Sequence, residues 1–436
     1  MLCYKLRRAI SNMTTTISNR CVALALAAVS LLGGIATTPA LAEDWPCWRG
    51  PRGDGTWNAP KLPEKWPDVG LRQVWRQPVG GGDAGVVVAD GRACTMDRQR
   101  EPDETERVLC FDAATGKPLW THAYPTAYGK LQHGNGPRAA STIHDGRVYS
   151  LGALGRVCCL DAATGRLLWT KDTVAECGAR IPMWGFAASP FIFGESVIVH
   201  VGAQPDGSFI AFDRKTGKEL WRSVPDRAGY CTPILIRHAG GPQLVCWTPE
   251  NVRGLDPRDG KPLWGVPYKV TYGVSIASPI FQEGIVVVAG YWEGSRAVQL
   301  GPGATDAKLL WEENRFLRGE MSQPLYRAGH VYLLDKTFGL TCFELKTGKK
   351  LWDDANQMTP KGRDPQASLV WLNDADRAII LNASGELILA RLNPAGYHEQ
   401  SRTKIIGKTW AHPAFTGRCV FARDGNELVC VELPAK

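Results

Sequence analysis

The strongest constraint on this 436-residue chain is an eleven-residue motif that recurs along it. Each strong copy joins a small residue, an acidic residue and a Thr-Gly or Asp-Gly pair to a final Trp; the copies are Cys110–Trp120, Cys159–Trp169, Ala211–Trp221, Gly254–Trp264 and Cys342–Trp352. Weaker matches end at Trp75 and Trp311, and consecutive repeat Trps lie 41 to 52 residues apart. That length fits four short strands with their turns, and it is too long for a leucine-rich or helical-pair repeat.

The turn chemistry within each repeat predicts β-hairpins. The acidic residue can accept hydrogen bonds from backbone N–H groups two or three positions later, and the glycine can adopt a positive φ. Pairs such as Asp90-Gly91 and Asp145-Gly146 predict further tight turns. We expect the first strand of a unit at Val86–Val88, at Phe191–Phe193 and at Ile285–Val288. No apolar pattern with a helical period reaches helical length, so the chain is predicted to be all-β.

The two ends of the repeat region complement each other. Residues 411–433 supply three strands without a Trp strand, whereas Leu71–Trp75 is a Trp strand without its first three. Together they make one blade that closes a ring and removes the open sheet edges. Residues 366–397 form a weaker unit with Tyr397 in the Trp place. At about 45 residues a unit, the sequence predicts an eight-bladed β-propeller of four-stranded antiparallel blades, with seven blades as the alternative if that weaker unit fails.

Residues 1–42 have the features of a signal peptide. Four basic residues and no acidic ones precede or border the apolar run Cys21–Ile35, and Ala40-Leu41-Ala42 supplies a cleavage pattern. A run of 15 residues falls short of the roughly 20 needed to span a bilayer. We therefore expect a periplasmic or secreted protein without a later transmembrane segment, made of a lead-in at 43–70 and a propeller at 71–436. Cleavage would lower the net charge from +8 to +4, which gives no support to nucleic-acid binding.

The motif resembles the PQQ-like β-propeller repeat family. Proteins of that family share an A-x-D-x-x-T-G-K-x-x-W motif, and the resemblance implies that Trp docks each blade onto its neighbour; the residues concerned are Trp75, Trp120, Trp169, Trp221, Trp264, Trp311 and Trp352. The lead-in Trp45–Gly55 also resembles the W-P-x-W-R-G-P opening of exported bacterial members. One branch of the superfamily comprises quinoprotein alcohol dehydrogenases with PQQ and Ca²⁺ over the axis. Another comprises non-catalytic, protein-binding propellers similar to the outer-membrane protein assembly lipoprotein.

Little in the sequence supports the catalytic branch. The pair Cys158-Cys159 could match the vicinal disulfide of quinoproteins, but it lies in a predicted third strand, where neighbouring side chains point to opposite faces. No cluster of Asp, Glu and Asn suits Ca²⁺. The glycine-rich segment Gly80–Gly85 precedes a strand and not a helix, so it predicts a flexible entry into the first blade. We expect no cofactor and no metal, with PQQ and calcium as the alternative.

The cysteines suggest one disulfide. Eleven remain after residues 1–42, and Cys94 occupies the second-strand place opposite Cys110 on the third strand. A cross-strand disulfide between them and a pair of buried thiols are equal alternatives.

The predicted binding surface consists of the loops that join one blade to the next, because such loops gather around the channel. Arg and aromatic residues recur in them and suit a planar or anionic ligand, an oligosaccharide or a protein. The candidates are Arg138, Arg180, Trp184, Arg227, Tyr230, Tyr272, Arg318, Glu320, Arg363, Trp410 and His412. We expect a monomeric, non-catalytic protein that binds a protein or carbohydrate there; a PQQ- and calcium-dependent dehydrogenase and a glycan-binding module are the alternatives.

Overall fold

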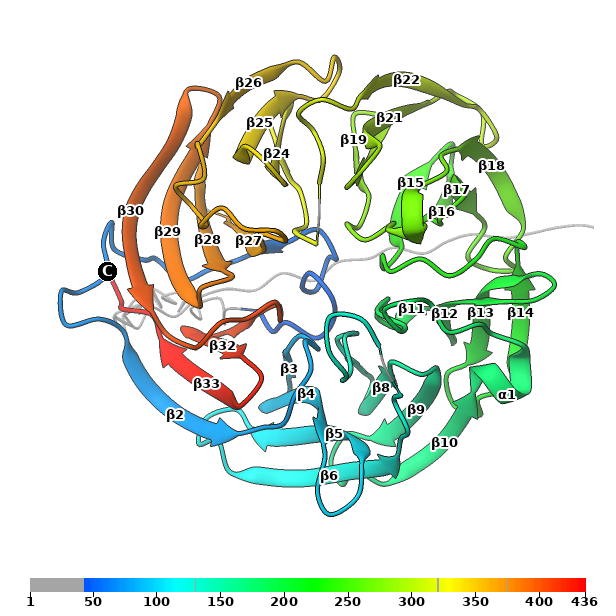
Figure 1. Cartoon of the computed structure of the whole chain (residues 1–436), viewed down its shortest axis with the longest axis horizontal. Helices are drawn as coiled ribbons and strands as arrows, with labels where there is room; N and C mark the ends of the chain where they lie inside the picture. Colours follow the sequence, from blue (N-terminus) through cyan, green and yellow to red (C-terminus); the bar gives the residue numbers. More distant parts are fainter. Residues whose placement is uncertain (1–42, 130, 320, 374) are drawn as a thin grey trace, which may run out of the picture. The chain divides into compact units, whose positions relative to one another are not determined.

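The computed structural model describes residues 43–436 apart from 130, 320 and 374. The predicted signal peptide, residues 1–42, lies outside these residues, as does Glu320. The described residues form eight antiparallel sheets arranged as a ring, with one five-residue helix, α1 (Thr173–Cys177), and one short 3₁₀ turn, η1 (Thr271–Gly273) (Figure 1). The predicted eight-bladed propeller is therefore confirmed.

Each of the first four blades runs from an inner strand to an outer Trp strand. Blade 1 consists of β3 (Val87–Ala89), β4 (Arg92–Gln99), β5 (Thr105–Asp112) and β6 (Pro118–Pro125). Blade 2 consists of β7 (Thr142–His144), β8 (Arg147–Leu151), β9 (Arg156–Asp161) and β10 (Leu167–Asp172). Blade 3 consists of β11 (Phe191–Phe193), β12 (Ser196–Ala203), β13 (Gly207–Asp213) and β14 (Glu219–Ser223). Blade 4 consists of β15 (Ile234–His238), β16 (Gly241–Trp247), β17 (Asn251–Leu255) and β18 (Pro262–Pro267).

The next three blades repeat this order. Blade 5 consists of β19 (Ile280–Gln282), β20 (Ile285–Gly290), β21 (Gly294–Leu300) and β22 (Ala307–Glu313). Blade 6 consists of β23 (Leu325–Arg327), β24 (His330–Asp335), β25 (Gly339–Glu344) and β26 (Lys350–Asp353). Blade 7 consists of β27 (Ala367–Leu372), β28 (Arg377–Asn382), β29 (Glu386–Asn393) and β30 (Gly396–Lys404), and β1 (Thr56–Trp57) from the lead-in pairs in parallel with β27.

Blade 8 joins the two ends of the chain, as the sequence predicts. It consists of β31 (Ala414–Thr416), β32 (Cys419–Arg423), β33 (Glu427–Glu432) and β2 (Arg72–Pro78). Strand β2 pairs antiparallel with β33 and places Trp75 opposite Cys430. Because this pairing occupies the outer edge of β33, the ring closes by hydrogen bonds between segments about 360 residues apart.

The repeat turns have the predicted chemistry. Asp112 accepts from the backbone N–H of Thr115 at 2.8 Å, and Gly116 has φ 72°. A Cβ on Gly116 would lie 2.6 Å from Cδ2 of Trp75, so the indole of the preceding blade packs directly on this glycine. The same contact recurs between Trp120 and Gly165. The glycine therefore serves both the turn and the close approach of the indole from the preceding blade.

The repeat Trps lie between consecutive blades. Five of them donate from the indole N–H to a backbone carbonyl of the next blade at 2.9 to 3.1 Å; they are Trp75, Trp120, Trp169, Trp311 and Trp352. Trp264 instead donates to Gln243 at 2.8 Å, and the buried indole N–H of Trp221 has no hydrogen-bond partner among the described residues. All seven belong to, or pack against, the buried apolar clusters that separate the blades.

Two sequence assignments are wrong. Ile285–Val288 lies in β20, the second strand of blade 5, because the short strand β19 precedes it. Both strands are apolar, so composition did not separate them. Tyr397 does not take the Trp place either, because it packs against the cluster between blades 6 and 7. Trp66 of the lead-in fills the apolar cluster that includes Leu387 of blade 7 and the strands of blade 8.

Candidate functional site

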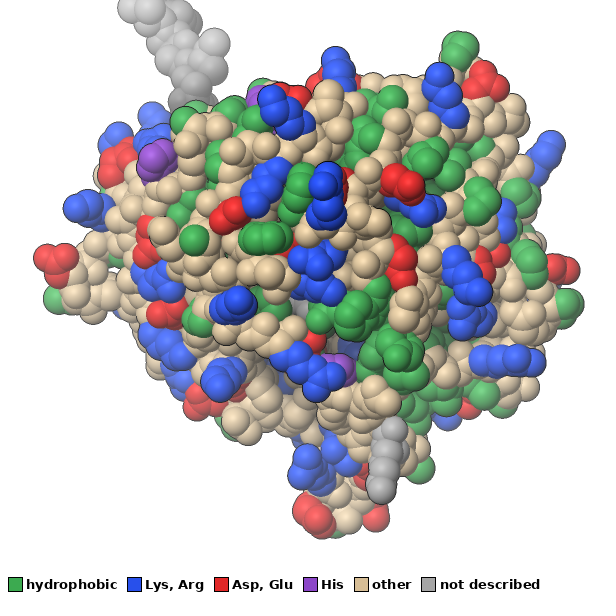
Figure 2. Space-filling view, turned by 45° about the horizontal axis from the view of Figure 1, so that its top comes forward, with side chains coloured by type: hydrophobic (Ala, Val, Ile, Leu, Met, Phe, Trp, Pro, Cys, Tyr) green, Lys and Arg blue, Asp and Glu red, His purple; other side chains and the backbone are tan. Residues whose placement is uncertain are grey.

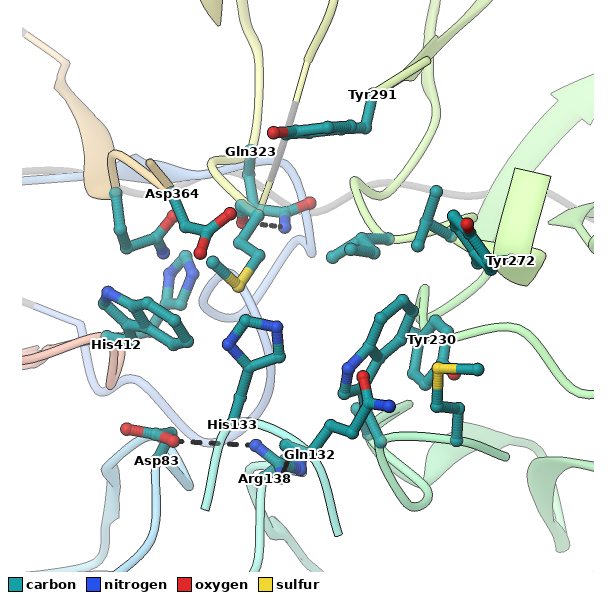
Figure 3. A pocket seen from close by; sticks show the side chains of 18 of the residues that line it. Asp83, Gln132, His133, Arg138, Tyr230, Tyr272, Tyr291, Gln323, Asp364 and His412 are labelled. Atoms are coloured by element: carbon teal, nitrogen blue, oxygen red, sulfur yellow. Dashed lines mark hydrogen bonds and ion pairs between the residues drawn. The ribbon is translucent and has the colours of Figure 1, made fainter. Parts of the chain in front are cut away.

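The loops that join consecutive blades converge on one cavity of about 550 Å³ at the centre of the ring (Figure 3). All eight of these loops contribute side chains to it. Seven of the residues predicted from the sequence line this cavity; they are Arg138, Trp184, Tyr230, Tyr272, Arg363, Trp410 and His412. The predicted loop set is thus brought together in large part.

Three predicted residues lie outside the cavity lining. Arg180 is exposed, and Arg227 pairs with Glu250 at 2.6 Å. Arg318 donates to the hydroxyl of Thr337 at 3.0 Å. Their loops approach the axis, but these side chains do not reach the cavity.

Several lining residues were not among the predicted set. Trp48 comes from the lead-in, Tyr291 and Trp292 come from the β20–β21 hairpin, and Asp83 comes from the glycine-rich entry into blade 1. The W-P-x-W-R-G-P resemblance was the one signal that could have indicated Trp48. Nothing in the repeat distinguishes the β20–β21 hairpin from the corresponding hairpins of other blades.

The lead-in crosses the centre of the ring, where Figure 1 shows it in blue. Trp45 forms a backbone bridge with Val88 of β3, and the indole N–H of Trp48 donates to Ser278, beside β19, at 3.0 Å. Arg49 donates to the carbonyl of Pro324, beside β23, at 2.9 Å. Contacts with inner parts of blades 1, 5 and 6, together with the pairing of β1 in blade 7, anchor this segment across the channel. The cavity is therefore lined on one side by a segment from outside the repeats.

Aromatic rings follow one another along the cavity wall. The ring of Tyr230 lies 5.4 Å from that of Trp184, and Trp184 lies 5.9 Å from His133. His133 in turn lies 5.6 Å from Trp410. Successive planes are inclined by 50° to 54°, so the rings do not stack face to face. His133 is exposed and Trp184 and Trp410 are partly exposed, whereas Tyr230 is buried behind them at 7% exposure. Such a wall offers apolar and quadrupolar contact to a ligand.

The charged side chains of the wall occur as opposite pairs. Nη1 of Arg138 lies 3.7 Å from Oδ2 of Asp83, and Nε of Arg363 lies 3.8 Å from Oδ2 of Asp364. Burial, with the nearby positive charge of Arg49, lowers the pKa of His412 to about 3. His412 is therefore neutral near pH 7, and the described lining carries no net charge from these groups.

Two residues of the lining have backbone conformations that side chains disfavour. His133 has φ 59° and Tyr272 has φ 55°, and neither is a glycine. Non-glycine residues in this region are strained and cluster at functional sites. Tyr272 is also 64% exposed and Trp292 48% exposed, and Met183 of the same lining is exposed as well. Figure 2 shows hydrophobic side chains gathered beside a hollow in the surface. Positive φ also occurs at hairpin turns of the blades, as at Asp90 and Asp145, so the exposed aromatic rings are the feature that sets the cavity mouth apart.

The cysteines lie away from this cavity. Cys158 belongs to the cluster between blades 1 and 2, and Cys159 to the cluster between blades 2 and 3, both as buried free thiols. Cys94 and Cys110 face each other across β4 and β5 and are likewise buried free thiols. These thiols contribute to packing between blades and do not line the cavity.

The described residues do not match a calcium–quinone site. Ca²⁺ takes six to eight oxygen ligands, commonly from several carboxylates. Asp83 and Asp364, the carboxylates of the described lining, belong to loops of different blades, are separated in Figure 3, and each lies beside its own arginine. Within the described part of the chain, no group of three or more His, Cys, Asp or Glu could hold a metal ion. Cys158 and Cys159 are also absent from the lining.

The described residues contain no helix of the length and apolarity that a membrane crossing requires.

Solved structures share this fold. A europium-containing methanol dehydrogenase aligns with a TM-score of 0.66 at 11% identity, over 89% of this chain and 98% of its own. A quinohemoprotein alcohol dehydrogenase from Pseudomonas putida HK5 aligns with a TM-score of 0.64 at 13% identity, over 90% of this chain and 81% of its own. BamB from Moraxella catarrhalis aligns with a TM-score of 0.58 at 17% identity, over 84% of this chain and 98% of its own. At such identities the likeness establishes the fold alone.

Sequence comparison identifies the family. No curated protein matches the chain. The family model described as outer membrane protein assembly factor BamB matches residues 104–353 and, in an overlapping match, residues 248–435. These matches cover more than half of the chain and most of the propeller. The chain therefore belongs to the PQQ-like β-propeller family that this model describes.

Proposed function

We propose that this chain is an exported, non-catalytic binding or scaffold protein that acts through the channel-mouth cavity. The observation that carries the proposal is the convergence of all eight inter-blade loops on one aromatic-lined cavity. Its volume of about 550 Å³ lies within the range of about 300 to 1,000 Å³ that ligand pockets occupy. Aromatic and arginine side chains at its mouth are those that dominate binding energies at interfaces.

The family supports the same function. The matching model is named for an assembly factor, and a BamB structure shares the fold. Residues 1–42 are the basis for proposing a periplasmic or secreted location, and we propose that the protein acts as a monomer. The dehydrogenase structures align with higher TM-scores, 0.66 and 0.64 against 0.58 for BamB, so catalysis is the function against which the proposal is tested.

The binding test exposes three immobilised proteins to a cell-envelope extract and compares what each retains. Wild type, Trp410→Ala and Arg180→Ala are immobilised, and retained proteins and small molecules are identified by mass spectrometry. Trp410 lines the cavity, whereas the Arg180 side chain lies outside the lining although its loop contributes Trp184. We expect at least one component to bind wild type and Arg180→Ala equally and to bind Trp410→Ala at least about tenfold more weakly, since interface tryptophans often contribute 2 kcal/mol or more.

The catalytic test adds PQQ and Ca²⁺ to the purified protein and measures alcohol-dependent dye reduction. We expect no turnover above that of a heat-inactivated sample. Robust turnover would overturn the non-catalytic proposal. Identical retention profiles for wild type and Trp410→Ala would overturn the assignment of the binding site to this cavity.

A further inference from the structure

The cavity offers an incoming ligand little unpaired charge. Nη2 of Arg138 already donates to the carbonyls of Gln132 and Gly134 at 2.9 and 2.7 Å, in addition to the pairing with Asp83. Arg363 has Asp364 beside it, and His412 is neutral. Arg363 is 88% exposed and makes no hydrogen bond to Asp364 at 3.8 Å, but an anionic ligand at either guanidinium would lie near a carboxylate, Asp83 or Asp364, and the like charges would repel each other.

Neutral hydrogen-bonding groups remain available instead. Gln366 is 2% exposed, and its Oε1 accepts from the hydroxyl of Ser322 at 3.1 Å, which fixes the amide. The Nε2 donor of Gln366 has no partner among the described residues, although the residue lines the cavity. The imidazole of His412 packs at 4.3 Å on the ring of Trp48, and its two nitrogens make no hydrogen bond within the described chain. A neutral imidazole offers one donor and one acceptor.

The aromatic wall is extended along one direction. Four rings, from Tyr230 through Trp184 and His133 to Trp410, follow one another at 5.4 to 5.9 Å. A ligand that matches it needs several ring units with apolar faces, and hydroxyl groups at its edges to meet the amide and imidazole. Aromatic faces carry partial negative charge and attract the slightly positive C–H groups of such rings.

We infer that the cavity binds a neutral oligosaccharide, with at least two sugar rings along the Tyr230–Trp184–His133–Trp410 wall and hydroxyl groups at Gln366 and His412. This inference rests on the proposed binding function and names its ligand class. Oligosaccharide hydroxyls can both donate and accept, so one sugar edge can satisfy an amide donor and a neutral imidazole together.

The test measures binding of defined hexasaccharides by titration calorimetry. The neutral probes are hexamers of β1,4-linked glucose, α1,4-linked glucose, xylose, mannose and N-acetylglucosamine; the charged probes are hexamers of galacturonate and a sulfated glucosamine–uronate. We expect saturable binding of at least one neutral hexamer and weaker or undetectable binding of the charged ones. The affinity for a neutral hexamer should stay within about twofold between about 0.1 and 1 M salt. Over this range the Debye length shortens from about 10 to 3 Å, which weakens contacts between charges and leaves neutral contacts unchanged.

Variants locate the binding. His133→Ala and Trp410→Ala should each lower the affinity for the bound hexamer at least about tenfold. Trp410→Phe should keep most of the affinity, because it retains an aromatic face. His144→Ala is the matched control, since His144 is also an exposed histidine but lies at the end of β7 outside the cavity lining; it should change the affinity less than about twofold.

Three outcomes would overturn the inference. They are binding of the charged hexamers alone, binding of a neutral hexamer with an affinity that Trp410→Ala leaves unchanged, and the absence of binding to every hexamer. If no hexamer binds while an envelope component still distinguishes wild type from Trp410→Ala, the ligand class is wrong and the proposed binding function stands. If neither a hexamer nor an envelope component distinguishes wild type from Trp410→Ala, both the ligand class and the proposed binding function are wrong.

Discussion

Trp75 and Trp410 show two uses of the same side chain. Trp75 is 7% exposed, donates to the carbonyl of Ala113 at 2.9 Å and packs on Gly116 of blade 1. Trp410 lies on the loop before blade 8, lines the cavity, and its indole N–H has no hydrogen-bond partner in the described chain. The first is held by a repeated set of contacts, and the second has only neighbouring rings, among them His133 at 5.6 Å.

This difference separates the blade interfaces from the channel mouth. At the interfaces, buried indoles have few free groups and their contribution is to stability. At the mouth, rings stay partly exposed and polar groups remain unused, at some cost to stability that binding can offset. We therefore expect substitutions in the two regions to have opposite profiles, with the unfolding free energy affected in one and binding in the other.

The largest contrast is between Trp75→Ala and Trp410→Ala. Trp75→Ala leaves a cavity in the closing blade and removes a buried hydrogen bond, and should lower the free energy of unfolding by about 3 to 5 kcal/mol. Trp410→Ala should lower it by less than about 1 kcal/mol. The measurement is denaturant unfolding followed by circular dichroism and fluorescence. Equal losses of stability in the two variants would break the comparison.

A smaller effect is expected at the glycine that receives the indole. Gly116 and Gly91 have φ 72° and 71°, but a Cβ would lie 2.6 Å from Trp75 at Gly116 and would meet nothing within 4 Å at Gly91. Both Gly→Ala variants incur about 1 kcal/mol of backbone strain. Gly116→Ala should lose a further 1 to 3 kcal/mol, roughly, through overpacking. The same unfolding assay checks this, and indistinguishable midpoints would show that the indole does not dock closely on Gly116.

The third contrast concerns acid stability within a blade interface, and its effect for each pH unit, at most about 1.4 kcal/mol, is the smallest of the three. The buried ring of His200 stacks at 4.2 Å on Phe209 and accepts from the N–H of Gly229 at 3.1 Å. Burial lowers the pKa of His200 to about 4, below its unfolded value near 6.5. The neutral form is therefore favoured by the fold, so its stabilising contribution is present above pH 6.5 and is lost as the pH falls towards 4.

His200→Gln keeps an acceptor for Gly229 and removes this titration. Between pH 6.5 and 4, wild type should lose stability more steeply than His200→Gln, by at most about 1.4 kcal/mol per pH unit. Unfolding midpoints measured across this range give the slopes. Parallel slopes would show that His200 does not couple protonation to folding.

The ring itself could be predicted in detail. Copies such as Cys110–Trp120 set the turns and strands, and the complementary ends at Leu71–Trp75 and 411–433 predicted a closure that the pairing of Trp75 with Cys430 confirms. Errors arose where the repeat weakens. The apolar run Ile285–Val288 predicts a first strand but forms the second strand, β20. Tyr397 is predicted in the Trp place but packs between blades 6 and 7, and Trp66 of the lead-in fills the apolar cluster at blades 7 and 8.

The candidate site was only partly predictable. The positions of the loops follow from the repeat, and residues such as Trp184 and His412 line the cavity. The direction of a loop side chain does not follow from it, so Arg180 and Arg227 had the same sequence signal as Arg138 but lie outside the lining. The rings of the β20–β21 hairpin had no separate signal.

What the sequence alone determined was the architecture: an all-β ring of eight blades closed by its N-terminal strand. It could do so because each blade depends on short-range hydrogen bonds and on an indole that meets a glycine one repeat away. Only the tertiary structure decided which side chains share a cavity, and that Trp48 reaches it from a lead-in that crosses the channel. Those contacts join segments up to 364 residues apart, as between Trp48 and His412, without a repeated motif, so their geometry depends on the packing of the whole ring.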